Sequence, residues 1–138
     1  MYTIYTDGGA RGNPGPAGAG AVIYDAKGTE RARVSEYLGH RTNNWAEYEA
    51  LRLALEALLT LIPEDKRAEA EVVVKLDSQL IERQLKGAYR VKEPALKEQY
   101  KKVDALRANF PRIDFLHIPR EENTRADALA NEAMDRGR

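Results

Sequence analysis

The stretch Tyr2–Tyr24, YTIYTDGGARGNPGPAGAGAVIY, decides the fold. Its first part, Tyr2–Thr6, consists of β-branched and aromatic residues, which predicts a strand. Asp7–Pro16 is dense in Gly and Pro, which predicts a turn-rich loop. Gly18–Tyr24 is expected to form a second strand, antiparallel to the first, and Arg31–Leu38 a third.

Beyond these strands the hydrophobic pattern predicts alternating helices and strands. Apolar residues recur at three- and four-residue steps over Asn44–Ile62, which predicts a long helix that Pro63 ends. The remaining elements are expected as strands at Glu71–Leu76 and Ile113–Ile118, and as helices at Ser78–Lys86, Glu93–Asn109 and Thr124–Asp135.

The resulting order βββαβααβα predicts an α/β fold with a mixed five-stranded sheet and helices on both faces. Three antiparallel strands come first and two parallel strands follow. Right-handed crossovers place the fourth and fifth strands beside the first, so the carboxyl ends of strands one and four meet at one edge. At 138 residues we expect a single domain over residues 1–138.

The composition excludes several classes of function. The chain has no cysteine, which excludes disulfide partners, thiolate metal sites and cysteine nucleophiles. It shows no signal peptide and no apolar run long enough for a membrane helix, so we expect a cytoplasmic monomer without membrane contact. The net charge is zero, but Arg83–Arg107 holds eight basic and three acidic residues. That span is either a solvated helix face or a surface for an anionic partner.

Four acidic residues lie at the ends of predicted elements. Asp7 follows the first strand and Asp77 the fourth, whereas Glu47 and Asp127 lie in the first turns of two helices. Each has a local explanation: Asp7 as a turn residue, Asp77 as a helix N-cap, and the other two as members of capping boxes that begin at Asn44 and Thr124. In the predicted architecture, however, all four point at one place, which local roles do not require.

Four crowded carboxylates repel one another unless cations neutralise them. Oxygen ligands favour a hard ion such as Mg²⁺ or Mn²⁺, and two such ions balance four negative charges. Paired ions of this kind promote the attack of water on a phosphodiester. The pattern therefore predicts a metal-dependent nuclease.

The chain resembles the type 1 ribonucleases H. The residues that carry the resemblance form four blocks in the family's order, namely Tyr5–Gly9 with Gly12–Pro16, Thr42–Glu47, Asp77–Gln79 and Asn123–Ala130. The resemblance implies an endoribonuclease that hydrolyses the RNA strand of RNA–DNA hybrids and leaves 5′-phosphate and 3′-hydroxyl ends. It also implies that Asp7 bridges two ions, that Asp127 helps to hold the ion that activates water, and that Glu47 and Asp77 hold the other.

The resemblance further nominates residues that bind the hybrid. These are Asn13, Asn44 and Gln79 in the minor groove, the backbone of Gly8 and Gly9 at close approach, and Thr42 and Asn43 at phosphates of the DNA strand. Local alternatives remain open, because Asn13 also suits a turn, Asn44 a helix N-cap, and the other two a polar loop.

The chain also departs from the family's usual pattern. Many members have Ser where this chain has Gly9, and many carry a basic, Trp-rich protrusion where only Gly87–Lys92 is present. Lys97, Lys101 and Lys102 of the following helix are a partial substitute for that protrusion.

Well-known type 1 ribonucleases H place a mobile His in the loop before the last acidic residue. His117 is expected on the buried face of its strand with Ile113 and Phe115, where it cannot move. Arg120 follows Pro119 in a loop and can reach a phosphate, so we favour Arg120 as the residue that assists turnover.

Three other classes of function fit parts of the pattern. These are a catalytically weak hybrid-binding module, a DNA-directed nuclease of the same fold, and a nucleotide-binding α/β protein. The four intact acids argue against the first. The Asn-Pro-Gly and Asn-Asn blocks argue against the second, and the lack of a P-loop argues against the third.

Overall fold

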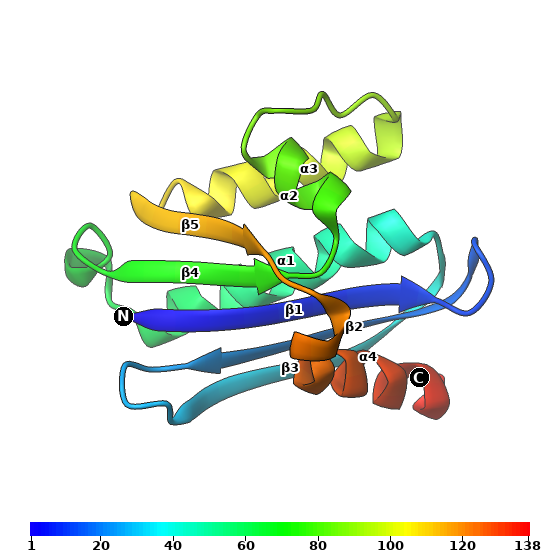
Figure 1. The fold of residues 1–138 in the computed structure, drawn as a ribbon, viewed down its shortest axis with the longest axis horizontal. Coiled ribbons are helices and arrows are strands. Elements are labelled where there is room, and N and C mark those ends of the chain that lie inside the picture. Colours follow the sequence, from blue (N-terminus) through cyan, green and yellow to red (C-terminus); the bar gives the residue numbers. More distant parts are fainter.

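The computed structural model describes residues 1–138 as an α/β fold in the order βββαβααβα (Figure 1), which confirms the predicted class. The strands are β1 (Tyr2–Ala10), β2 (Gly15–Tyr24), β3 (Glu30–Arg41), β4 (Glu71–Leu76) and β5 (Arg112–His117). The helices are α1 (Asn43–Leu61), α2 (Gln79–Leu85), α3 (Pro94–Arg107) and α4 (Thr124–Arg136), with short 3-10 helices η1 (Glu64–Lys66) and η2 (Arg120–Glu122).

The five strands form one mixed sheet in the order β3-β2-β1-β4-β5. β1, β2 and β3 pair antiparallel, whereas β4 lies parallel to β1 and β5 parallel to β4. Helix α1 packs on one face of β1 and β2, and α3 packs on α1. Helix α4 covers β2, β3 and β1 from the other face (Figure 1). The predicted place of β4 beside β1 is therefore confirmed, whereas β5, also expected beside β1, pairs with β4 instead.

The main apolar core lies between the sheet and helices α1, α2 and α3. Ile4 and Val74 of adjacent strands face Leu51 and Leu55 of α1, and all four side chains are buried. Burying side chains of this size contributes about 1.5–3 kcal/mol each to folding, so this face fixes α1 against β1. Since Glu47 lies on the same helix, core packing also sets its height above the strand.

The opposite face of the sheet depends on small residues. A Cβ at Gly20 of β2 would lie 2.2 Å from the carbonyl oxygen of Ala126, and one at Gly18 would lie 2.5 Å from that of Ala130. Both helix residues belong to the first two turns of α4. The glycines therefore allow α4 to approach β2 closely, and this approach brings Asp127 towards β1.

The first strand is longer than expected, so the predicted loop Asp7–Pro16 is largely wrong. The ladder with β2 continues through Asp7↔Gly20 to Ala10↔Ala17, and the second strand begins at Gly15. Gly usually weakens a strand, but here it is needed where a helix approaches the sheet. A Cβ at Gly8 would lie 2.2 Å from the carbonyl oxygen of Ala46 in α1.

The capping roles considered for three helices are also wrong. Thr42 caps α1, because its Oγ1 accepts a hydrogen bond from the backbone N–H of Trp45 at 3.2 Å. Ser78 rather than Asp77 caps α2, and Asn123 precedes α4 without a capping hydrogen bond from its side chain. Glu47 is the fifth residue of α1, beyond a capping position. Hence the acids are not explained by helix capping.

None of the helices combines the length and the apolar character that a bilayer crossing requires.

Candidate active site

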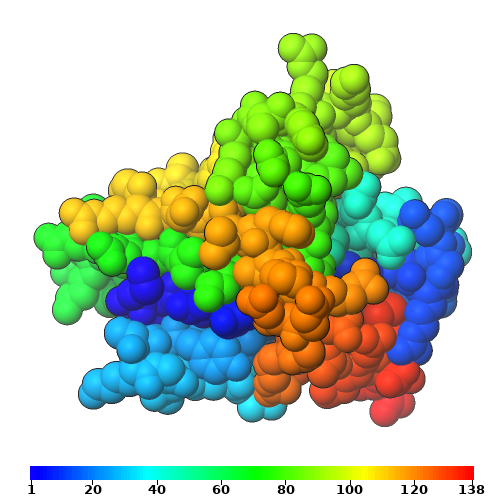
Figure 2. Space-filling view, viewed as in Figure 1, coloured from blue at the N-terminus to red at the C-terminus, as the bar shows by residue number.

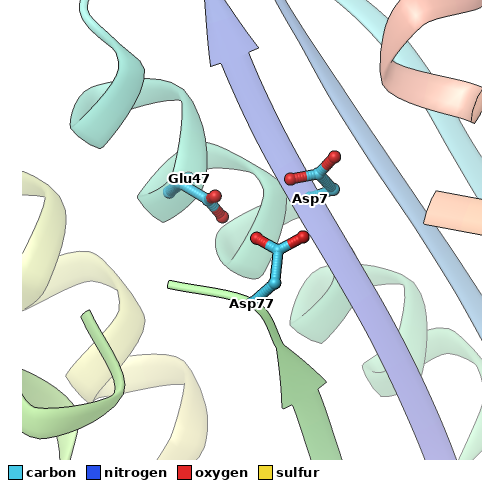
Figure 3. A group of neighbouring side chains, drawn as sticks. All are labelled: Asp7, Glu47 and Asp77. Carbon is cyan, nitrogen blue, oxygen red and sulfur yellow. The ribbon is translucent and has the colours of Figure 1, made fainter. Parts of the chain in front are cut away.

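Three carboxylates from three different elements meet at one point. Asp7 lies within β1, Asp77 directly follows the parallel neighbour β4, and Glu47 extends from α1 (Figure 3). One carboxylate oxygen of each lies within 4.8 Å of those of the other two. Glu47 is buried, whereas Asp7 and Asp77 are partly buried. The parallel pairing of β1 and β4 therefore places Asp7 and Asp77 side by side, and helix α1, which packs on one face of the sheet, supplies Glu47.

Asp127 completes the acidic site from the other side of the sheet. It lies in the first turn of α4 and is half-buried. It is near enough to Asp7 to contribute to the raised pKa of that carboxyl group. It stands outside the tight group of three, so the structure separates an inner set from a fourth acid at the rim.

Burial and mutual repulsion disfavour the charged forms of the inner acids. Burial first, and then the neighbouring Asp77 and Asp127, raise the pKa of Asp7 from 3.8 to about 8, against the opposing effect of Arg120. Burial and the charges of Asp7 and Asp77 raise the pKa of Glu47 well above its ordinary value, although the backbone N–H of Gly8 lowers it.

This arrangement fits a divalent cation. The buried Oε2 atom of Glu47 has no hydrogen-bond partner within the protein. A buried polar atom without a partner costs free energy, and a cation among the three carboxylates would remove that cost. The donors are all carboxylate oxygens, which suits a hard ion. The ligand atoms and burial of the acidic cluster are therefore those of a metal-binding site.

The raised pKa of Asp7 predicts how the stability of the metal-free protein depends on pH. The folded state keeps a proton that the unfolded chain releases near pH 4, so the free energy of unfolding falls as the pH rises from about 4 to about 8. Millimolar Mg²⁺ should offset the loss, because an ion that binds only the folded state stabilises it. Melting curves at pH 5 and pH 8 should show a larger gain in Tm with Mg²⁺ at pH 8. Equal gains at both values would contradict the assignment.

The acids line an open pocket of about 400 Å³, called here the carboxylate pocket. It brings together nine of the residues singled out from the sequence, namely Asp7, Gly8, Gly9, Asn43, Asn44, Glu47, Asp77, Arg120 and Asp127. Asn13, Thr42 and Gln79 lie outside its lining. Asn13 is nevertheless close, because its Oδ1 accepts a hydrogen bond from the backbone N–H of Asn43 at 3.0 Å. Gln79 is exposed at the start of α2, directly after Ser78 of the pocket.

His117 does not occupy the predicted position. It is the last residue of the edge strand β5 and is exposed, whereas Phe115 is buried as expected. The alternation of buried and exposed side chains fails at His117 because β5 is an edge strand and ends at this residue. Arg120 lies in η2 rather than in an irregular loop, and its exposed side chain reaches the carboxylate pocket.

Sequence reasoning missed a residue that holds Asp77. The side chain of Asn123 is almost fully buried, and its Nδ2 donates to the carbonyl oxygen of Thr6 at 2.8 Å and to Asp77 Oδ2 at 3.3 Å. It therefore joins the segment before α4 to β1 and to the acid at the end of β4. Its place at the head of the Asn123–Ala130 block was the available signal. Arg11, Ser78 and Asn131 also line the pocket and were not singled out.

The comparisons with known proteins agree with this geometry. A family model described as reverse transcriptase-like matches residues 5–133. The chain is similar to LC11-RNase H1, which was isolated from compost and has a crystal structure in complex with an RNA/DNA hybrid. The sequence of the protein in that complex is 53% identical to this chain. The two structures have a TM-score of 0.92, over 99% of this chain and 98% of that one. The chain belongs to the type 1 ribonuclease H family.

Two curated relatives extend the likeness. Ribonuclease HI of Halobacterium salinarum is 42% identical over 131 residues, which are 95% of this ribonuclease H chain and 63% of that protein. Bifunctional protein Rv2228c of Mycobacterium tuberculosis is 43% identical over 133 residues, which are 96% of this chain and 35% of that protein. The chain thus spans only about a third to just under two thirds of these two relatives.

The structure also shows how this ribonuclease H differs from many members of its family. A Cβ at Gly9 would lie 3.7 Å from Asn43 Oδ1, which is an ordinary contact. The fold therefore has room for a Cβ at this position, although this chain has glycine there. Helix α2 ends at Leu85 and α3 begins at Pro94, so the basic protrusion is absent. Lys97, Lys101 and Lys102 are exposed on α3.

Proposed function

We propose that residues 1–138 act as one ribonuclease H domain that hydrolyses the RNA strand of RNA–DNA hybrids, with two divalent ions bound beside the substrate. The carrying observation is the buried Glu47 carboxylate, without a hydrogen-bond partner on Oε2, beside Asp7 and Asp77 in an open pocket. The 53% identity to LC11-RNase H1, whose structure is in complex with an RNA/DNA hybrid, supports the substrate.

The four acids have distinct tasks in the proposed reaction. Asp7 lies near all three of the other acids and would be the shared ligand, whereas Glu47 and Asp77 would hold one ion and Asp127 would help to hold the second. Mg²⁺ or Mn²⁺, when bound, neutralises the carboxylates and polarises the attacking water and the phosphodiester. Water adds to phosphorus and the bond from phosphorus to the 3′ oxygen breaks, which leaves a 3′-hydroxyl and a 5′-phosphate.

The neighbouring residues position the duplex rather than react with it. Gly8 and Gly9 line the carboxylate pocket, and their backbone can approach the RNA strand closely because neither has a side chain. Asn13, Asn44 and Gln79 are our candidates for minor-groove contacts, which detect 2′-hydroxyl groups without reading the sequence.

Thr42 and Asn43 are proposed to contact phosphates of the DNA strand. The Oδ1 atom of Asn43 already accepts a hydrogen bond from the backbone N–H of Ala10 at 2.7 Å, so its amide Nδ2 is the group left for a phosphate. The Thr42 hydroxyl accepts from Trp45 and can still donate its proton. Both side chains therefore support the helix start and keep a donor for the substrate.

A cleavage assay with four substrates of one sequence tests the proposal. The RNA–DNA hybrid, the two homoduplexes and the single-stranded RNA are incubated with and without Mg²⁺. We expect the RNA of the hybrid alone to be cut, only with the ion present, and with 5′-phosphate ends. Binding of the hybrid without cleavage would favour a hybrid-binding module, and cleavage of the DNA duplex would favour a DNA-directed nuclease.

The lysines of α3 are expected to add affinity rather than catalysis. Changing Lys97, Lys101 and Lys102 to Gln should raise KM and lower the log–log salt slope of binding by about one unit for each lost phosphate contact. The value of kcat should change by less than about twofold. A Lys27→Gln, Lys66→Gln protein is a control, because both lysines are exposed and lie outside α3. An unchanged slope in the triple variant would show that the helix face is merely solvated.

Arg120 is expected to act on turnover. Arg120→Ala should lower kcat by about tenfold or more, because the guanidinium lies near Asp7 and can form charge-assisted bonds to a phosphate. The pH profile of kcat should show no inflection from a histidine. His117→Ala is the matched control, and since that side chain is exposed, its kcat and Tm should stay near those of the unchanged protein. The opposite ranking would assign the role to His117.

A further inference from the structure

Two arginines line the carboxylate pocket, and they stand at different ends of α4. Arg120 lies in η2, just before the helix, whereas Arg11 lies on the turn between β1 and β2. The Nη2 atom of Arg11 lies 2.7 Å from Asp135 Oδ1. The same atom donates to two oxygens of Asn131, to Oδ1 at 3.3 Å and to the backbone carbonyl oxygen at 3.4 Å. Figure 2 shows the blue β1–β2 segment against the red end of α4.

The contacts of Arg11 follow a line along the helix. Asp127, Asn131 and Asp135 are spaced by four residues, so they share one face of α4. Asn131 lies about 6 Å and Asp135 about 12 Å along the axis from Asp127. Helix α4 extends beside β1 towards the β1–β2 turn (Figure 1). A strand whose scissile phosphate lies at the carboxylates can therefore present a neighbouring phosphate at Arg11.

The ion pair between Arg11 and Asp135 is easily replaced. The two side chains are 47% and 69% exposed, and exposed pairs of this kind contribute at most about 1 kcal/mol. A guanidinium binds phosphate oxygens with charge-assisted hydrogen bonds. The turn does not depend on the side chain, because the backbone N–H of Arg11 donates to the carbonyl oxygen of Pro16 at 2.8 Å.

We propose that Arg11 binds a backbone phosphate of the RNA strand next to the one that is cut, and that Asp135 occupies the guanidinium until the substrate arrives. Asp135 thus competes with the hybrid for Arg11. This inference rests on the proposed function, because it needs a strand bound along α4 with its scissile phosphate at the four acids.

The first test is Arg11→Gln, measured with a short RNA–DNA hybrid and Mg²⁺. Loss of one charge-assisted contact should raise KM about tenfold and lower the salt slope of binding by about one unit. The value of kcat should change by less than about twofold, because the contact is made in the bound substrate and the transition state alike. Tm should stay nearly constant, since the backbone hydrogen bond of the turn remains.

The second test is Asp135→Asn, which removes the competitor. KM should fall by about twofold to fivefold, as expected when an exposed ion pair no longer opposes binding. Glu132→Gln is the matched control: it removes one charge from the same helix, but Glu132 pairs with Arg136 and lies outside the pocket. Its KM should not change. In the protein with both Arg11→Gln and Asp135→Asn, KM should equal that of Arg11→Gln alone.

The outcomes separate this inference from the proposed function. If the unchanged protein does not cleave the hybrid with Mg²⁺, the proposed function fails. If it cleaves and Arg11→Gln keeps the same KM and salt slope, Arg11 does not bind the strand. A fall in KM for Glu132→Gln as large as that for Asp135→Asn would overturn the competition, as would a rise in KM accompanied by a loss of Tm for Asp135→Asn.

Discussion

Asp7→Asn is expected to lower hybrid cleavage by about 1000-fold or more and to leave the metal-free protein as stable as before, or more stable. The amide has the same shape but cannot serve as the anionic metal ligand proposed for Asp7, and a metal site of this kind contributes several kcal/mol to stabilising the transition state. The substitution also removes a carboxyl group whose pKa is raised to about 8 by burial and by Asp77. Because the charged form is disfavoured, metal-free Asp7→Asn should melt at a higher Tm at pH 8, and the gain should shrink towards pH 4.

A second aspartate supplies a control with the opposite sign. Asp25 accepts hydrogen bonds from the backbone N–H groups of Thr29 and Lys27 at 3.0 and 2.9 Å, and these contacts hold its pKa below the ordinary value. Asp25→Asn should therefore lower Tm slightly at neutral pH and leave cleavage unchanged. Near-normal turnover in Asp7→Asn, measured beside this control, would rule out the shared-ligand role.

The topology and the meeting of the acids could be predicted because both follow from connection rules. Right-handed crossovers place β4 parallel to β1 and beside it, and the register Thr6↔Leu76 puts Asp7 and Asp77 directly after a pair of facing residues. The periodicity of α1 then placed its apolar face on the sheet, and Glu47 near its start was directed at the same place. These steps needed no knowledge of side-chain contacts.

The extent of β1 could not be predicted in this way. The sequence DGGARGNPGP reads as a turn because Gly and Pro usually mark one. Gly8 is instead required because α1 approaches the sheet closely there, and that requirement appears only when the layers are assembled. A local rule for glycine cannot distinguish a turn from a close helix contact.

The supporting contacts were hidden for a related reason. Asn123 reaches Thr6 across 117 positions of sequence, and Arg11 reaches Asn131 across 120. Spacing arguments compare neighbours on one helix or strand and are blind to such pairs. His117 shows the converse case, because strand alternation predicted a buried side chain at a position where the edge strand ends. The main acids could thus be read from the sequence, whereas their support could not.

Gly8→Ala is expected to damage both stability and activity, because the new Cβ has no space. It would lie 2.2 Å from the carbonyl oxygen of Ala46 and 2.6 Å from the backbone nitrogen of Glu47, so the start of α1 must move away from β1. We expect a loss of about 3 kcal/mol in the free energy of unfolding and a fall in Tm of about 10 °C.

The same shift moves the buried carboxylate of Glu47 away from Asp7 and Asp77, and a displacement near 1 Å is enough to lower kcat by about 100-fold. Gly9→Ala is the matched control for stability, because a Cβ at Gly9 meets nothing closer than Asn43 Oδ1 at 3.7 Å. Its Tm should stay within about 2 °C of the unchanged protein, since an added methyl group in a compatible strand position restricts mainly the unfolded chain. If Gly8→Ala melts like Gly9→Ala and cleaves normally, α1 has room to adjust, and the close contact with β1 does not fix the position of Glu47.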